Sequence, residues 1–128
     1  SDATLNPGGV RIGTAEIYRQ VEKVKQIIDS VVIGQKWHDD ERIILFVQLK
    51  AKFQLTDDLI KIIKQQIRKN TTPRHMPAKV IQVSAIPRTI SGKVVEVAVK
   101  KTVHGEKINN IEAIANPEAL EQFKIENW

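Results

Sequence analysis

A glycine and a lysine stand together near the end of the chain, in the segment IPRTISGKVVEVAVKK at residues 86–101. The ammonium group of Lys93, next to the flexible Gly92, is the kind of group that neutralises charge on a phosphate or carboxylate during a reaction. The pair is not part of a Walker A loop, because Pro87 stands where its first glycine would be and Val94 replaces the Ser or Thr that holds magnesium. Since most lysines are simply exposed to solvent, the segment alone leaves open whether Lys93 is catalytic.

A second candidate site lies near the start of the chain, in the segment PGGVRIG at residues 7–13. Gly8 and Gly9 allow positive φ angles and a close approach of the backbone to a ligand, and the forked donors of Arg11 suit a phosphate. On their own, the same residues are more typical of a tight hairpin turn. Arg68, on a helix predicted further along, is another candidate anion ligand, and its alternative is a solvated arginine.

Metal binding and serine hydrolysis find no support in the sequence. His38, His75 and His104 are far apart and form no H-x-x-x-H pair, and the chain has no cysteine. The serines lie in no G-x-S-x-G context. We therefore expect no metal site in this chain and no nucleophilic serine.

The composition is that of one globular domain of 128 residues, with 41% hydrophobic and 27% charged residues and a net charge of +5. The positive charge favours an anionic partner, but the scattered aromatic residues do not form the basic and aromatic stripe of a nucleic-acid binder. No apolar run approaches the length of a membrane-spanning helix. The opening residues do not resemble a signal peptide, and cysteine is absent. We therefore expect a cytoplasmic protein that binds neither nucleic acid nor membranes.

The first half of the chain predicts one helix followed by two strands. Thr14 is placed to cap the helix, and apolar residues recur after it at every third or fourth position. This stripe consists of Ile17, Val21, Val24 and Ile28. β-Branched residues then predict strands at 29–37 and 43–49, joined by a polar loop at 38–42 into an antiparallel hairpin.

A second helix is predicted after Thr56, a suitable N-cap followed by two aspartates that complement the helix dipole. Its buried face is expected to consist of Leu59, Ile60, Ile62, Ile63 and Ile67. Pro73 and Pro77 end this helix, and a third strand is predicted at 79–87.

The last part of the chain is less regular. Residues 94–103 suit either a strand or a short helix, residues 104–115 are expected to be the least structured, and Asn116 followed by Pro117 begins a final helix. This order of elements predicts an α+β fold, a small and mainly antiparallel three-stranded sheet covered by helices, with an N-terminal glycine-rich hairpin.

Over essentially its whole length the chain resembles the small C-terminal domain of the adenylate-forming acyl-CoA synthetases, a superfamily shared with luciferases and peptide-synthetase adenylation domains. Two motifs carry the resemblance, SDATLNPGGVRIGTAEIY and IPRTISGKVVEVAVKK, about 80 residues apart. GKVVEVAVKK and IANPEALEQF are most similar to the members that activate acetoacetate. A synthetase of acetate or propionate is the alternative within the family.

The resemblance implies that residues 1–128 are a single lid domain, cut at the hinge from a large N-terminal domain that is absent. In the family a carboxylate attacks ATP to give an acyl-adenylate and pyrophosphate, and CoA then displaces AMP. Lys93 would serve the first step, with Ser91 and Gly92 supporting its loop. The hinge would be Asp2.

The same resemblance places the CoA-binding residues at Gly9, Arg11 and Arg68. ATP, the acyl-adenylate, CoA and acetoacetate would be the substrates or intermediates, Mg²⁺ would be bound by the large domain, and the main protein partner would be the enzyme's own N-terminal domain. The isolated domain would be inactive. A different reading, a free-standing CoA- or nucleotide-binding module, would bind such a ligand without the large domain.

Overall fold

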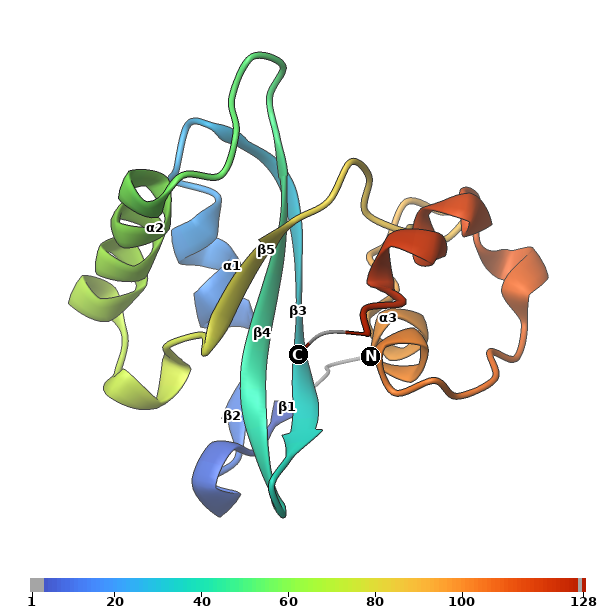
Figure 1. Ribbon diagram of the computed structural model, residues 1–128, viewed down its shortest axis with the longest axis horizontal. Coiled ribbons are helices and arrows are strands. Elements are labelled where there is room, and N and C mark those ends of the chain that lie inside the picture. The colour runs from blue at the N-terminus through green and yellow to red at the C-terminus, as the bar shows by residue number, and fades with distance from the viewer. Residues whose placement is uncertain (1–3, 127) are drawn as a thin grey trace.

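The computed structural model describes residues 4–126 and residue 128. Its strands are β1 (Thr4–Leu5), β2 (Ile12–Gly13), β3 (Ile27–Trp37), β4 (Asp40–Leu49) and β5 (Lys79–Gln82), and its α-helices are α1 (Ala15–Val21), α2 (Asp57–Asn70) and α3 (Glu96–Val103). Short 3-10 helices lie at Pro7–Gly9, Pro73–His75, Ile111–Ala113 and Pro117–Phe123. Figure 1 shows the sheet in the middle, with α1 and α2 on one side and α3 and the C-terminal 3-10 helices on the other.

The main sheet has the order β3-β4-β5. β3 and β4 are antiparallel, whereas β5 returns after α2 and pairs parallel to β4. The predicted α+β class and the helix-covered, three-stranded sheet are confirmed. β1 and β2 pair antiparallel as a separate two-stranded sheet, with residues 6–11 between them.

Both faces of the main sheet are buried, which explains why β4 is continuously apolar over residues 43–47 instead of alternating. Residues at alternate positions of β4 enter different cores. Ile43, Leu45 and Val47 pack with α1 and α2. Ile44 and Phe46 pack with α3 and the C-terminal segment, where the Phe46 ring meets Phe123 with centroids 4.6 Å apart.

The turn between β3 and β4 is shorter than the polar loop predicted at 38–42. Trp37 pairs directly with Asp40, so that only His38 and Asp39 connect the strands. Both have positive φ angles, 49° and 62°, which suits the twist of a two-residue hairpin. The loop prediction was wrong because the polar residues at 40–42 belong to a strand.

The first helix is also shorter than its apolar stripe suggested. α1 ends at Val21, Val24 is buried in the following turn, and Ile28 lies in β3 with 56% of its surface exposed. A register shift between Ile27 and Asp29 marks a β-bulge at Ile28. The helix therefore ends before its apolar spacing does, and that spacing continues through a turn into β3 by chance.

The second helix follows the prediction at its start. The Thr56 side chain accepts a hydrogen bond from Leu59 N at 3.2 Å, which confirms the N-cap. Leu59, Ile63 and Ile67 are buried, but Ile62 is 47% exposed and does not belong to the buried face.

For the second half of the chain, the structure corrects two predictions and decides a third. The third strand ends at Gln82 instead of continuing to residue 87. Of the two possibilities for 94–103, the helix is correct, as α3. The segment 104–115 includes a 3-10 helix, and its Ile114 is buried and pairs with Thr89. In the described part of the chain, none of the helices has both the length and the apolar character needed to cross a membrane.

Candidate functional site

Lys93 lies on a tight hairpin between β5 and α3. Thr89 N donates to the Lys93 carbonyl at 2.7 Å, and Gly92 N donates to the Thr89 carbonyl at 2.8 Å. Gly92 has a φ of 90°, a conformation that favours glycine in the last position of such a turn. The turn thus holds the backbone of Lys93, while its side chain is exposed to solvent.

Threonine and serine hydroxyls reinforce this turn from within. Thr89 Oγ1 accepts a hydrogen bond from Lys93 N at 3.0 Å and lies 2.9 Å from Ser91 Oγ. Ile90, at the tip, is 75% exposed. Ser91 therefore contacts the residue that fixes the lysine backbone.

We call residues 88–93 the lysine loop. Residues 113–116, in the C-terminal segment, hold its base. Asn116 Oδ1 accepts from Arg88 N at 2.9 Å, and its Nδ2 donates to the Ile86 carbonyl at 3.1 Å. Ile90 N donates to the Ala113 carbonyl at 3.1 Å. Asn116, predicted only as the start of a helix, thus also holds the segment that leads into the loop through its side chain.

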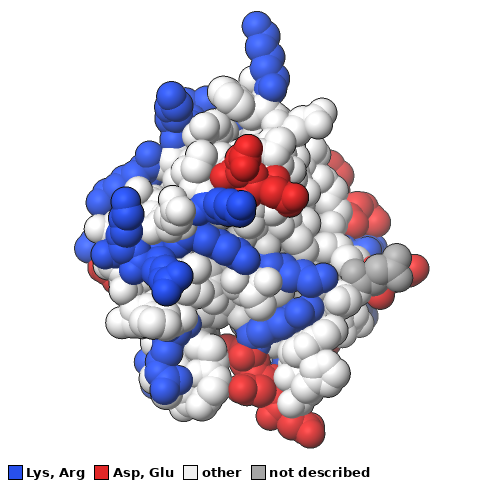
Figure 2. Space-filling model, turned by 60° about the vertical axis from the view of Figure 1, so that its left-hand side comes forward, with Lys and Arg blue, Asp and Glu red and all other residues white. Residues whose placement is uncertain are grey.

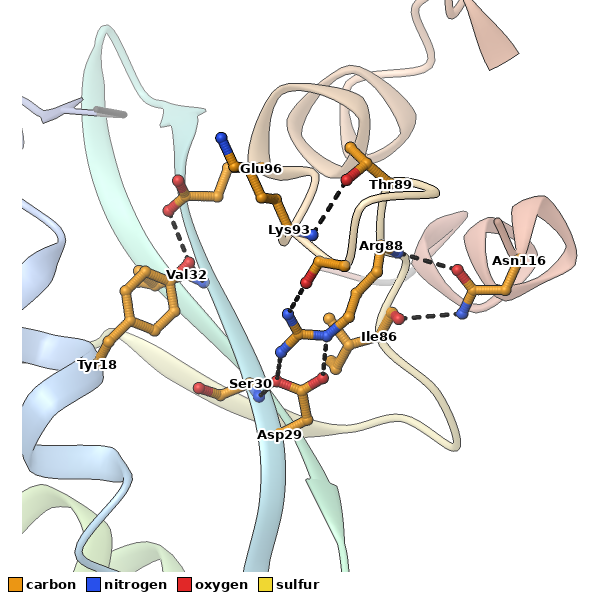
Figure 3. Close-up of polar contacts among 11 residues, drawn as sticks. Tyr18, Asp29, Ser30, Val32, Ile86, Arg88, Thr89, Lys93, Glu96 and Asn116 are labelled. Atoms are coloured by element: carbon orange, nitrogen blue, oxygen red, sulfur yellow. Dashed lines mark hydrogen bonds and ion pairs between the residues drawn. The ribbon is translucent and has the colours of Figure 1, made fainter. Parts of the chain in front are cut away.

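Arg88 connects the lysine loop to β3 (Figure 3). Its Nε donates to Asp29 Oδ2 at 2.9 Å and its Nη2 to Asp29 Oδ1 at 2.6 Å, a two-point ion pair. Its Nη1 donates to the Gly92 carbonyl at 2.6 Å. The guanidinium therefore bridges a strand of the sheet and the residue directly before Lys93.

A second polar contact holds the beginning of α3. Tyr18 Oη donates to Glu96 Oε2 at 2.6 Å and accepts from Val32 N, on the edge strand β3, at 3.1 Å. Burial, and then the hydrogen bond to Glu96, raise the pKa of Tyr18 far above its usual value. A cleft of about 400 Å³ opens beside these residues, lined by Tyr18, Asp29, Arg88 and Val94 among others.

The N-terminal glycine segment lies against the far end of the β3–β4 hairpin. Asn6 N donates to Glu41 Oε2 at 2.6 Å, and Gly8 N donates to Asp40 Oδ1 at 3.1 Å. Gly9 has a φ of 80°, and a Cβ added there would meet no atom within 4 Å. Its surface is open in this domain, although its backbone conformation favours glycine.

The lysine loop and the N-terminal glycine segment, residues 6–11, which we call the glycine turn, are attached near opposite ends of β3. Asp29 holds the first, and Asp40, the partner of Trp37, holds the second. At about 3.3 Å per residue, Asp29 and Trp37 are roughly 25 Å apart. The two segments are therefore attached far apart along the β3–β4 hairpin.

The family model of the AMP-binding enzyme C-terminal domain matches residues 16–93. The chain belongs to this family. It is 58% identical over 123 residues to the acetoacetyl-coenzyme A synthetase of Rhizobium meliloti (strain 1021), covering 96% of this chain and 19% of that protein. An acetoacetyl-CoA synthetase of Caenorhabditis elegans is 47% identical over 125 residues, with 96% and 18% covered.

Among solved structures, the acetoacetyl-CoA synthetase from Streptomyces lividans matches with a TM-score of 0.85 and 39% identity, over 95% of this chain and 18% of that one. The AMP-binding C-terminal domain described here thus spans about a fifth of the length of these relatives. The predicted family is confirmed, and its acetoacetyl-CoA synthetase relatives agree with the resemblance seen in the sequence.

The arginines predicted to bind CoA are exposed and lie apart from the lysine loop. Arg11 is the last residue of the glycine turn, and Arg68 lies in the last turn of α2. Among the described residues, neither side chain takes part in a hydrogen bond or ion pair. Arg74 Nη1 approaches within 3.4 Å of the position that a Cβ on Gly8 would occupy. Figure 2 shows basic side chains gathered on the side of the molecule that carries α1 and α2.

Asp2, the predicted hinge, lies outside the described residues. The sequence also left unrecognised Asp29 and Arg88, which fasten the lysine loop, and Tyr18 and Glu96, which hold the start of α3. The signal for Arg88 was its place inside the motif IPRTISGK. Asp29 had none, because it lies 59 residues away from its partner.

Proposed function

We propose that this domain is the mobile C-terminal domain of an AMP-forming acetoacetate:CoA ligase. The observation that carries the proposal is the separation of two exposed segments, the lysine loop and the glycine turn, at opposite ends of β3. One small substrate cannot contact both at once, so that two successive reactions would each use one face. The similarity to acetoacetyl-CoA synthetases supports acetoacetate as the acid.

In the first reaction, a carboxylate oxygen of acetoacetate attacks the α-phosphorus of ATP, and the bond to pyrophosphate breaks. Negative charge is then shared between the attacking carboxylate and the phosphate oxygens. The ammonium of Lys93 would neutralise this charge, as cationic side chains do in other phosphoryl-type transfers. The turn from Thr89 to Gly92 fixes the backbone from which this side chain extends, which lowers the entropic cost of placing it.

In the second reaction, the thiol of CoA attacks the acyl carbon, and AMP leaves. The domain would rotate about Asp2 to present the glycine turn, since a few hinge residues can absorb such a motion. Gly9 would line the path of the CoA thiol, where a side chain would obstruct it. Arg11 and Arg68 would bind the phosphates of CoA.

The large N-terminal domain would be the principal partner. It would hold ATP together with Mg²⁺, and it would shape the pocket for the acid. The chain described here would supply no catalysis without it.

The test separates the two half-reactions in the full-length enzyme. Lys93→Ala is expected to lower adenylate formation, measured as ATP–pyrophosphate exchange, at least about a hundredfold, while thioester formation from supplied acetoacetyl-adenylate continues. Gly9→Leu is expected to do the opposite. Lys23→Ala, an exposed lysine without a role in the proposal, is the matched control.

Equal loss of both half-reactions in Lys93→Ala would contradict this division of labour. If the enzyme prefers acetate or propionate to acetoacetate, the proposed mechanism stands but the proposed acid substrate is wrong. Binding of CoA to the isolated domain at the affinity of the full-length enzyme would instead favour a free-standing binding module.

A further inference from the structure

We infer that Arg88 is a positioning residue for Lys93, and that Asp29 holds it in place. The inference rests on the proposed function, because it assigns to the ion pair a part in the adenylation step. Arg88 and Asp29 lie 59 residues apart in the chain. In the fold they form the side-chain connection between the lysine loop and the central sheet (Figure 3).

The bulge in β3 places Asp29 on the correct face. Val31 and Ile33 belong to the core beneath α3, whereas Val32 belongs to the core beneath α1 and α2. Strand alternation gives Asp29 the face of Val31. Without the bulge Ile27 would share that face, yet Ile27 packs in the other core. Because of the extra residue, Ile27 and Asp29 lie on opposite faces of the strand, although they are only two positions apart. Ile27 packs in its core, and Asp29 reaches Arg88.

The planar guanidinium of Arg88 donates three hydrogen bonds whose directions are fixed relative to one another. Two contact the carboxylate of Asp29, and the third contacts the Gly92 carbonyl at 2.6 Å. Because Gly92 immediately precedes Lys93, a rotation of this peptide would change the direction in which the Lys93 side chain leaves the backbone. A lysine at position 88 would keep the charge but lose the planar fork that makes all three contacts.

Other contacts hold the parts of the fold around the lysine loop. The ion pair between Arg88 and Asp29 therefore affects the loop and not its surroundings. Asn116 fixes the base of the loop, and Glu96 fixes the start of α3 through Tyr18. The side chains of Arg88 and Asp29 are 38% and 18% exposed, and partly exposed ion pairs contribute little to global stability. Loss of the pair should therefore loosen the loop and leave the domain folded.

The experiment uses the full-length enzyme with Arg88→Ala, Arg88→Lys, Asp29→Asn and the double variant Asp29→Asn/Arg88→Ala. Adenylation kcat is expected to fall about ten- to a hundredfold, as for a displaced catalytic group. KM for ATP and thioester formation from supplied acetoacetyl-adenylate should change little. The double variant should be no worse than Arg88→Ala, since the two residues act through one contact. Arg88→Lys should recover little of the lost activity.

Arg19→Ala breaks an exposed ion pair with Glu16 and is the matched control; it should leave both half-reactions unchanged. Thermal unfolding of each variant separates loop effects from loss of the fold. Unchanged adenylation in Arg88→Ala, or equal loss of both half-reactions, overturns the inference. If Lys93→Ala itself leaves adenylation intact, the proposed function fails instead, so the two failures are distinguishable.

Discussion

Gly34 in β3 leaves the space that the carboxyl group of Glu41 occupies. A Cβ at Gly34 would overlap that carboxyl group. From this position Glu41 accepts a hydrogen bond from Asn6 N at 2.6 Å and lies 3.6 Å from Lys100 Nζ. The missing side chain in the strand thus allows one carboxylate to connect the glycine turn with α3.

Gly34→Ala is expected to displace the Glu41 side chain and to release the backbone of Asn6. The cost should be about 1–2 kcal/mol in the free energy of unfolding, since a flexible side chain can move aside but loses its partners. Urea denaturation of the domain measures this change. Gly13→Ala is the matched control, because a Cβ at Gly13 would meet no atom within 4 Å. Equal effects of the two substitutions would contradict the role given to Gly34.

Thr56→Ala should remove the N-cap of α2. Its hydroxyl accepts from Leu59 N at 3.2 Å, and loss of such a cap costs about 1 kcal/mol. Thr56→Ser keeps the hydroxyl and should restore most of that stability. Urea midpoints of the three proteins provide the comparison, and an equal loss in the serine variant would show that the methyl group matters instead.

Gly92→Ala should strain the lysine loop, because a residue with a side chain is disfavoured at a φ of 90°. The expected cost is about 1–2 kcal/mol, which the loop can relieve by changing its turn. In the full-length enzyme, adenylation should therefore slow more than thioester formation. The two half-reaction rates, measured beside the melting temperature, check this; a fall in melting temperature with unchanged adenylation would mean that the strain does not reach Lys93.

Sequence patterns predicted the features that depend on neighbouring residues. The apolar run from Ile43 to Val47 indicated a strand, and Thr56 indicated the start of a helix, because both signals are local. The motif around Gly92 and Lys93 likewise indicated a turn next to a candidate catalytic group. These features can be predicted from the sequence because they do not depend on the tertiary structure around them.

Features that depend on tertiary pairing were not predictable in this way. Ile28 continued a helical spacing, but it lies at a bulge in β3, beyond the end of the helix. Asp29 looked like an ordinary polar residue, since nothing nearby reveals an arginine 59 positions later. Gly34 gave no signal of its own, because its role depends on where the Glu41 side chain runs.

The hydroxyl of Tyr18 gives the clearest prediction of pH dependence. Burial and the hydrogen bond to Glu96 raise its pKa in the folded state, whereas in the unfolded chain the group titrates near its usual value of about 10. Its contribution to stability is therefore complete below about pH 10 and is lost as the pH rises further, because only the unfolded state then releases the proton. The slope should approach about 1.4 kcal/mol per pH unit for this single group.

The chain has one tyrosine, so tyrosinate absorbance reports this group alone. On raising the pH, the absorbance should appear only together with unfolding, measured in parallel by circular dichroism. Tyr18→Phe should show a flatter decline of the unfolding free energy above about pH 10 than the parent, because lysines titrate in both proteins while only the parent has the phenol. Tyrosinate that forms near pH 10 while the fold remains intact would mean that the hydroxyl reaches solvent and does not hold α3 through Glu96.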